Sequence, residues 1–368
     1  MDVVTPGIPG QNRIMPIQTL TRTLRMPAVA AAIAAMCLMA LAPAPAAGQT
    51  KPITVKMATL VPDGTSWHLV LKEVAAEWSK ISGGKVKMNL YPGGTAGDDP
   101  DVVRKMNLGS LQAAVLTSVG LAELDKTIYA FSIPMAFEDY DEVYYVIDKM
   151  KPRFEANLLK KGYVVLNWAD GGWAQFFAKK PVTTPDDLKK LKLFQWAGDQ
   201  PLLKIWQSAG FNPVAAASTE LPSGLQTGLF EAFNAPPQVV AITRYYENAK
   251  YMTDLKWALL MGATVIRKET WEEIPADLRP KLLEAAQRAG AKLQAEIRKS
   301  GDADVAAMKG SKTGLVVVPV DAKTKELWRK TAEATYPSVR GTIVPADAFD
   351  EALKYRDDYR KQKAAAKK

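Results

Sequence analysis

The sequence predicts an α/β protein of two lobes, with mostly parallel sheets flanked by helices. From residue 53 the chain runs through a strand, a helix and a second strand, and such alternation continues along most of its length. This pattern is typical of sheets covered on both faces. Its 368 residues are enough for two domains. Gly171-Gly172 separates two strand-like halves, and such a pair allows the unusual backbone angles of a crossing between lobes.

The first 46 residues differ from the rest and are interpreted as a signal peptide. Arg13, Arg22 and Arg25 precede the apolar run "AVAAAIAAMCLMALA", which is too short to span a bilayer comfortably. Residues 44–46 read Ala-Pro-Ala and fit the small-x-small rule for cleavage after residue 46. A buried N-terminal helix is the alternative, and the basic flank disfavours it. The sole cysteine, Cys37, lacks the small preceding residue of a lipoprotein signal, so a soluble exported protein is expected.

Composition excludes several classes of function. No cysteine follows residue 46, which excludes disulfides, thiol catalysis and cysteine metal ligation in the mature chain. The formal net charge of +9 falls to about +7 on cleavage, because three arginines and one aspartate are removed. The lysine pairs are scattered and no arginine-aromatic motif accompanies them, so nucleic-acid binding is unsupported.

Strands are predicted where apolar residues alternate with polar ones or form short apolar runs bounded by turns. The region around Gly171-Gly172 and the segment 257–264 are the two expected crossovers between lobes. The expected strand segments are 53–58, 85–92, 111–118, 163–182, 191–196, 212–217, 229–236, 251–254, 257–271 and 314–320.

Helices are predicted where apolar residues recur at helical spacing between capping signals. Ser66 is the expected cap of the first helix, and Asp99 or Asp101 that of the second. One helix is expected to break at Pro152, and another is expected to start at Thr184. The expected helical segments are 67–82, 99–106, 139–162, 184–190, 200–209, 218–228, 238–249 and most of the chain after 275.

Five sequence blocks, in this order and at these intervals, resemble the dicarboxylate-receptor (DctP) type of substrate-binding protein from TRAP transporters. Each block is weak evidence alone, but together they cover nearly all of the mature chain. The blocks are "LYPGGTAGDDPDVVRKMNLGSLQ", "FSIPMAF", "TTPDDLKKLKL", "LPSGLQTGLFEAFNAPP" and "EEIPADLRPKLLEAA".

The resemblance implies a two-lobed periplasmic binding protein fold with an interdomain cleft and long C-terminal bracing helices. It implies that lobe closure captures a small organic solute, which is then delivered to the permease subunits of an ion-gradient-driven transporter. We expect residues 47–172 to form lobe I, with 262–303 returning to it, and residues 173–261 to form lobe II, with the C-terminal helices of 304–368 packing on it. A monomer without cofactor, metal or enzymatic activity is expected.

The resemblance also implies a site from which this sequence departs. Family members usually clamp a carboxylate with an arginine where Phe194 stands, and often with a second where Ala174 stands. The family's asparagine falls on Ala235. Because only guanidinium offers a bidentate fork for a carboxylate, a simple dicarboxylate is not expected. Arg104 and Arg244 leave capture of an anion open.

Aromatic rings stand where cleft residues are expected. Trp196, Phe194 and Phe233 are predicted to line the cleft, and Trp67 begins the first helix beside it. Flat apolar walls suit a ring or a hydrocarbon chain. Trp168 and Trp173 are also candidates to line the cleft. The alternative for each ring is packing in the core. Core packing is disfavoured for Trp196, whereas for Trp168 and Trp173 the two roles are equally favoured.

Polar candidates would orient the solute. They are Gln195, Asn234 and Thr117, together with Asp170 at the crossover. Asp170 between two tryptophans suits a ligand hydroxyl or ammonium group, so neutral, zwitterionic and cationic solutes all stay open. Asp199 is expected to cap a helix rather than bind.

Two other classes of function stay open beside the transport receptor. One is an exported enzyme with Asp170 as its base, although no paired acid, nucleophile or metal set accompanies it. The other is a ligand-binding partner of a sensor. The single histidine, His68, is expected at an exposed or half-buried helix start.

Overall fold

The computed structural model describes residues 51–366. The expected signal peptide, including Cys37, lies outside the described residues. In the part of the chain that the structure describes, every helix is too short or too polar to cross a membrane.

The described strands join in one ten-stranded sheet, with the order β2-β1-β3-β9-β4-β7-β5-β6 and with β8 and β10 added at β4. Pairings of β1 with β2 and β3, and of β5 with β6 and β7, are parallel, whereas β4 and β9 run antiparallel to their neighbours. The strands are β1 (Ile53–Thr59), β2 (Val86–Tyr91), β3 (Ala113–Thr117), β4 (Tyr163–Ala178), β5 (Lys192–Trp196), β6 (Asn212–Ala216), β7 (Ala232–Ala235), β8 (Tyr251–Thr253), β9 (Ala258–Arg267) and β10 (Val316–Val318).

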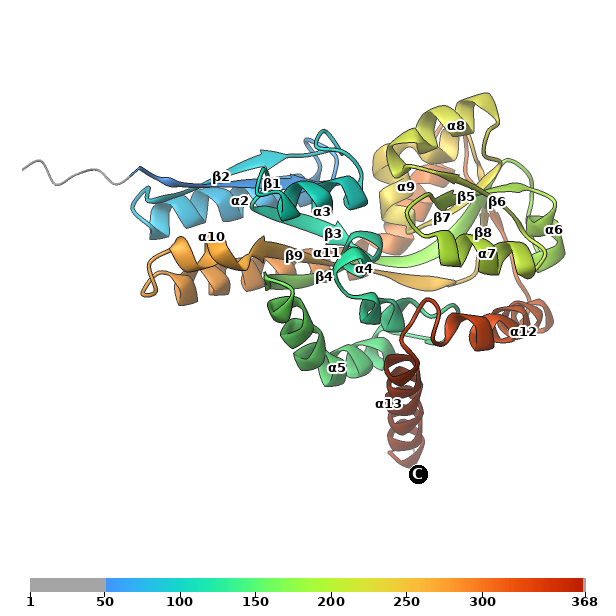
Figure 1. Cartoon of the computed structure of the whole chain (residues 1–368). Coiled ribbons are helices and arrows are strands. Elements are labelled where there is room, and N and C mark those ends of the chain that lie inside the picture. Colours follow the sequence, from blue (N-terminus) through green and yellow to red (C-terminus); the bar gives the residue numbers. More distant parts are fainter. Residues whose placement is uncertain (1–50, 367–368) are drawn as a thin grey trace, which may run out of the picture. The chain divides into compact units, whose positions relative to one another are not determined.

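Two long strands join the two ends of this sheet. We call the part around β1, β2 and β3 the first lobe and the part around β5, β6 and β7 the second lobe. β4 pairs with β9 over its first part and with β7 and β8 over its last residues, so it runs from one lobe into the other (Figure 1). The register of β4 against β9 shifts between Asp170 and Trp173, at the expected Gly171-Gly172 crossing.

Helices cover the strands of both lobes. The α-helices are α2 (Ser66–Ile81), α3 (Asp99–Asn107), α4 (Ser118–Leu124), α5 (Tyr140–Lys160), α6 (Pro185–Lys189), α7 (Gln200–Ser208), α8 (Leu221–Thr227), α9 (Pro237–Thr243), α10 (Lys268–Glu273), α11 (Arg279–Lys309), α12 (Ala322–Val339) and α13 (Ala346–Ala365). The 3₁₀ helices are η1 (Lys126–Ser132), η2 (Ser218–Glu220) and η3 (Tyr245–Glu247).

Several helix boundaries differ from the sequence prediction by a residue or two. Thr65, not Ser66, caps α2, and Asp98, not Asp99 or Asp101, caps α3. Neighbouring Ser, Thr and Asp residues are all competent caps, so sequence alone does not choose among them. α5 continues through Pro152, where Met150 and Phe154 on either side are buried in the core of the first lobe.

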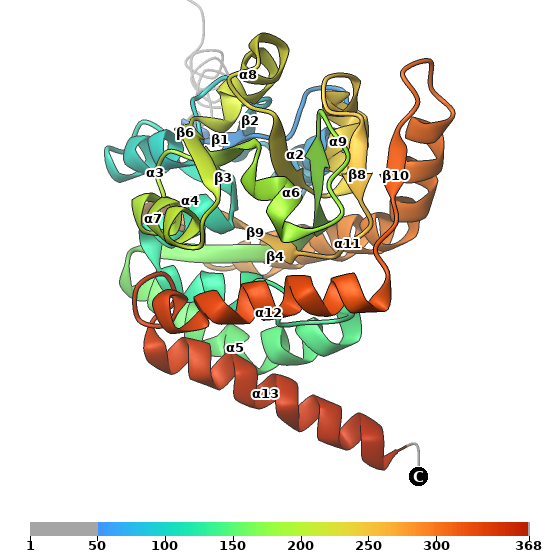
Figure 2. The same ribbon diagram turned by 90° about the vertical axis from the view of Figure 1, so that its right-hand side faces the viewer.

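The C-terminal helices divide between the lobes, whereas the sequence predicts that all of residues 304–368 pack on the second lobe. α12 lies against α6 and α7, and α13 lies against α5 and η1 (Figure 2). Arg360 of α13 pairs with the buried Glu142 of α5, and Arg153 of α5 contacts Glu351 of α13 at 2.8 Å. These ion pairs and the buried Phe349 attach α13 to the first lobe.

Candidate functional site

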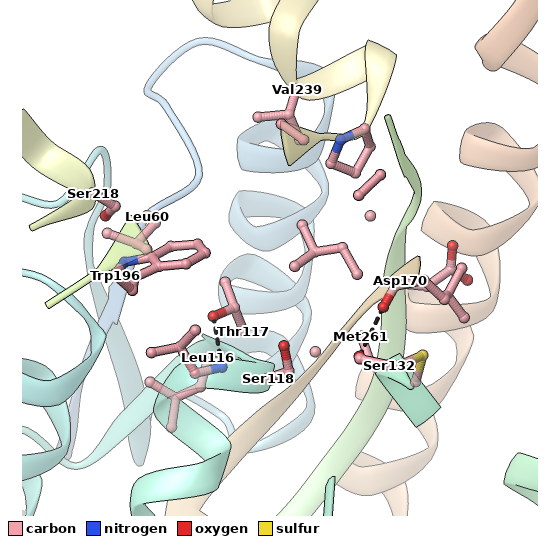
Figure 3. Close-up of a pocket in the computed structure, with 18 of the residues that line it drawn as sticks. Leu60, Leu116, Thr117, Ser118, Ser132, Asp170, Trp196, Ser218, Val239 and Met261 are labelled. Atoms are coloured by element: carbon pink, nitrogen blue, oxygen red, sulfur yellow. Dashed lines mark hydrogen bonds between the residues drawn. The ribbon is translucent and has the colours of Figure 1, made fainter. Parts of the chain in front are cut away.

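A cavity of about 560 Å³ lies between the lobes, within the usual size of small-molecule sites. Residues of β1, β3 and α2 line it from the first lobe, and residues of β5, η2, β7 and α9 line it from the second. Figure 3 shows Trp196 beside Leu60 and Ser218 at one side, Thr117 and Ser118 below, and Asp170 and Met261 at the other side. The wall is mostly apolar.

β5 ends at the cavity and supplies three of the predicted residues. Phe194, Gln195 and Trp196 all line it. Phe194 is 5 % exposed and packs edge-on against Trp196, with ring centroids 5.9 Å apart. Trp196 is half-buried and its Nε1 donates to Asp98 Oδ2 at 3.0 Å. The end of β5 therefore places the aromatic rings of Phe194 and Trp196 on the cavity wall.

Asp170 lines the cavity, but its carboxylate already has partners. Tyr144 donates from its hydroxyl to Oδ2, and the backbone N–H of Gly172 donates to Oδ1 at 3.0 Å. Burial raises the pKa of Asp170, and these two donors together with Arg298 partly oppose the rise. Because Arg298 also lies over the Tyr144 ring at 4.4 Å, Asp170 belongs to a polar cluster at the crossover.

Two other carboxyl groups flank the cavity. Asp199 lines it and caps α7 as predicted, accepting from the backbone N–H of Leu202 at 3.1 Å. Burial, and then the charge of Asp199, raise the pKa of the lining residue Tyr129. Behind the predicted Thr117, which lines the cavity, Asp99 accepts from the Thr117 hydroxyl at 2.6 Å. Burial raises the pKa of Asp99 to about 7.

Asn234 and Trp67 complete the predicted residues that reach the cavity. Asn234 is half-buried at the end of β7, where the chain turns into α9. Trp67 sits in the first turn of α2, and its Nε1 is buried with no hydrogen-bond partner among the described residues. An acceptor on a ligand would satisfy that donor.

The structure places three predicted aromatic residues away from the cavity. Trp168 donates from Nε1 to Glu155 Oε1 at 2.9 Å, and Trp173 packs on Tyr140 with centroids 5.7 Å apart. Successive strand residues point to opposite faces, so while Ala169 and Ala174 line the cavity, both tryptophans face α5. The third, Phe233, is fully buried, stacks on Phe177 and packs edge-on against Tyr245.

Sequence reasoning missed several lining residues. Tyr129, Val239 and Met261 all line the cavity, yet each lies in an apolar stretch that reads as core. Trp206 and Trp257 are buried and also border it. His68, expected exposed or half-buried, is 3 % exposed, with Nδ1 2.7 Å from Asp63 Oδ1.

The charged residues that line the cavity are Asp170 and Asp199, with no arginine or lysine among the described lining residues. Arg104 and Arg244, which the sequence left as candidates for an anion, are exposed and pair with Asp101 at 2.8 Å and Glu247 at 2.9 Å. Residues 51–366 also hold no cluster of metal-binding side chains.

Comparison with known proteins gives a consistent family. Residues 57–341 match the model of the DctP family, bacterial extracellular solute-binding protein, family 7. A solute-binding protein of Chromohalobacter salexigens is 26% identical over 230 residues, which cover 62% of this chain and 67% of that protein. The 2,3-diketo-L-gulonate-binding periplasmic protein YiaO of Escherichia coli is 25% identical over 228 residues, 61% of this chain and 69% of that protein.

Solved structures show the same fold. A TRAP periplasmic solute binding protein from Sulfurospirillum deleyianum, with bound succinate, superposes with a TM-score of 0.75 at 22% identity. The superposition covers 84% of this chain and 99% of that one. This likeness confirms the predicted two-lobed α/β class.

Proposed function

Because this chain belongs to the DctP family of bacterial extracellular solute-binding proteins, we propose that it is the extracytoplasmic receptor of a TRAP transporter. The family binds solutes, which confirms the expectation of a binding protein rather than an enzyme. Under this proposal the lobes close over a small organic solute and present it to the membrane permease subunits.

The solute we propose is held without a guanidinium clamp. The three positions at which the family resemblance expects two arginines and an asparagine are Phe194, Ala174 and Ala235, and all three line the cavity. The absence of arginine and lysine from the described lining residues is the observation that carries this part of the proposal. Small acids such as the succinate bound by the Sulfurospirillum protein would lack their usual partner here.

Apolar contact supplies most of the proposed affinity. Burying about 300 Å² of apolar ligand surface at about 25 cal/mol per Å² contributes about 7.5 kcal/mol. That free energy is near the value for micromolar binding, before the cost of association is subtracted. The Phe194 and Trp196 rings and the aliphatic side chains of Leu60 and Met261 provide the surface.

A few polar groups orient the proposed solute. Trp67 Nε1 donates to an acceptor, while Gln195, Asn234 and Thr117 offer neutral hydrogen bonds. Asp170 and Asp199 disfavour an anion by charge repulsion. A neutral, zwitterionic or cationic molecule with a ring or short chain fits this set of groups.

The proposal also covers the location of the receptor and the extent of its lobes. Residues 1–46 would direct export and be removed, leaving a monomeric periplasmic protein. The lobes would comprise 47–172 with 262–303, and 173–261, with α12 attached to the second lobe and α13 to the first by the contacts described above.

Native mass spectrometry of the purified protein, followed by denaturation and identification of any released compound, tests the proposal. We expect a retained compound with a ring or chain and no pair of carboxylates, released chemically unchanged. A retained dicarboxylate would contradict the proposed solute class, and a compound turned over during incubation would contradict a receptor.

A further inference from the structure

One carboxylate of the first lobe receives hydrogen bonds from two residues of the second. Asp98 precedes α3 and is 7 % exposed. Trp196 donates from Nε1 to Oδ2 at 3.0 Å. Ser218 donates from its backbone N–H to Oδ2 and from its hydroxyl to Oδ1, each at 2.7 Å.

Near these bonds, a glycine of each lobe lies close to a side chain of the other lobe. A Cβ added at Gly198, two residues after Trp196, would lie 3.0 Å from Cγ of Pro100. One added at Gly94 would lie 3.0 Å from Cγ2 of Thr219. The lobes therefore meet along a seam that we define as residues 94–100 of the first lobe against 196–198 and 218–219 of the second.

Capping of α3 does not account for this arrangement. The cap needs one bond, from the Asp99 N–H to Asp98 Oδ1 at 2.9 Å, and serine caps helices as well as aspartate does. The remaining donors all come from the other lobe. Bonds to a buried carboxylate are about twice as strong as neutral ones, so this residue type suits a contact between lobes.

The position of Asp98 relative to the cavity decides how it acts. Asp98 itself is not among the lining residues, whereas Trp196 and Ser218 are. Any effect of Asp98 on a solute must therefore pass through the residues that it holds. Without the bond to Nε1, the Trp196 indole is free to take other rotamers.

We propose that Asp98 is a positioning residue that fastens the closed lobes and fixes the Trp196 ring against the solute. Lobe separation withdraws the acceptor from Nε1, so the ring takes its place on the cavity wall only on closure. This inference rests on the proposed function, because it assigns the ring a role in the same site.

The test follows indole N–H signals of the ¹⁵N-labelled full chain by nuclear magnetic resonance. Trp196→Phe, which keeps an aromatic ring but removes the donor, identifies the Trp196 signal by its loss. In Asp98→Ser, which keeps a capping side chain, we expect the Trp196 indole proton to exchange with solvent about tenfold faster or more than in the wild type. Ser218→Ala, which removes only the hydroxyl bond, should give a smaller increase.

Two other indoles are internal controls. Trp78 donates to the backbone oxygen of Leu282 at 3.0 Å, and Trp328 donates to that of Thr183 at 2.8 Å. Both should keep their wild-type exchange rates in Asp98→Ser. Small-angle scattering of the same variant should show a larger radius of gyration, because the seam no longer holds.

An unchanged Trp196 exchange rate in Asp98→Ser would overturn the proposal. An increase shared equally by Trp78 and Trp328 would also overturn it, since it would report general destabilisation. Both measurements use the protein as purified with its retained compound, because the bond forms in the closed state. They do not depend on which compound that is, so failure here is distinct from a solute class that contradicts the proposed function.

Discussion

At the scale of single residues, Asp99 makes stability depend on pH. Its pKa rises from 3.8 to about 7 because the carboxyl is buried. Between about pH 4 and 7 the folded protein therefore binds more protons than the unfolded chain. The free energy of unfolding should fall as pH rises through this window and level off above it.

Asp99→Asn should flatten that dependence, measured by urea denaturation at a series of pH values. The amide oxygen can still accept from Thr117 and Gly120, the partners of Asp99 Oδ2, but the side chain no longer titrates. Asp101→Asn, which removes an exposed carboxylate from the same helix, is the matched control. The Asp99 assignment fails if both variants keep the wild-type slope.

Phe194 gives a second prediction at this scale. Phe194→Arg places a charge beside the rings of Trp196 and Phe230. Their centroids lie 5.9 and 5.2 Å from the centroid of the Phe194 ring. We expect at least about tenfold weaker binding of the retained solute, or about 1.4 kcal/mol, measured by calorimetry. Phe194→Leu, which stays apolar, should lose less. If Phe194→Arg bound the solute with the same affinity as the wild type, Phe194 would not be part of the binding site.

At the scale of elements, α11 packs on the crossing strand β4 through a small residue. A Cβ at Gly290 would lie 2.9 Å from Cβ of Asn167. Asn167 itself donates to the backbone oxygen of Ala286 at 3.0 Å and accepts from the Thr264 hydroxyl at 3.1 Å. This side chain therefore ties α11, β4 and β9 together beside the cavity.

Gly290→Ala and Gly301→Ala form a matched pair within α11. We expect Gly290→Ala to lower the free energy of unfolding by about 1–2 kcal/mol, because overpacking against Asn167 exceeds the gain in helix propensity. Nothing lies within 4 Å of a Cβ at Gly301, so Gly301→Ala should raise it by about 0.5–1 kcal/mol. Chemical denaturation measures both, and stabilisation by both would contradict the close packing.

For the helices and strands, the sequence predicts some features and misses others. Local signals predicted the strands, the Asp199 cap and the end of α8 at Gly228. They did not predict which way the Trp168 and Trp173 rings point, because the register shift in β4 changes the face that each residue presents. The contact of Asp98 with Trp196 joins residues 98 positions apart, and no local pattern encodes it.

At the scale of the whole molecule, surface and cavity differ in charge. The chain carries a formal net charge of +9, yet the charged residues lining the cavity are aspartates. Many arginines outside the cavity pair with nearby carboxylates, as Arg340 does with Asp350 at 2.6 Å. The family resemblance could predict the two lobes. It could not predict that the described lining residues include no arginine or lysine, which follows from the residues that this sequence has at positions such as 174 and 194.

Solute binding should therefore show the heat-capacity signature of apolar burial. Closure of the lobes over a ligand on the Trp196 and Phe194 wall removes apolar surface from water, which makes the heat-capacity change of binding negative. Titration calorimetry of the released and purified solute at several temperatures measures it, with each apolar Å² contributing about −0.45 cal/K/mol. Phe194→Leu should reduce its magnitude, whereas Lys72→Ala on the exposed face of α2 should not. A heat-capacity change near zero, with affinity falling steeply as salt increases, would indicate capture of an anion by cations instead.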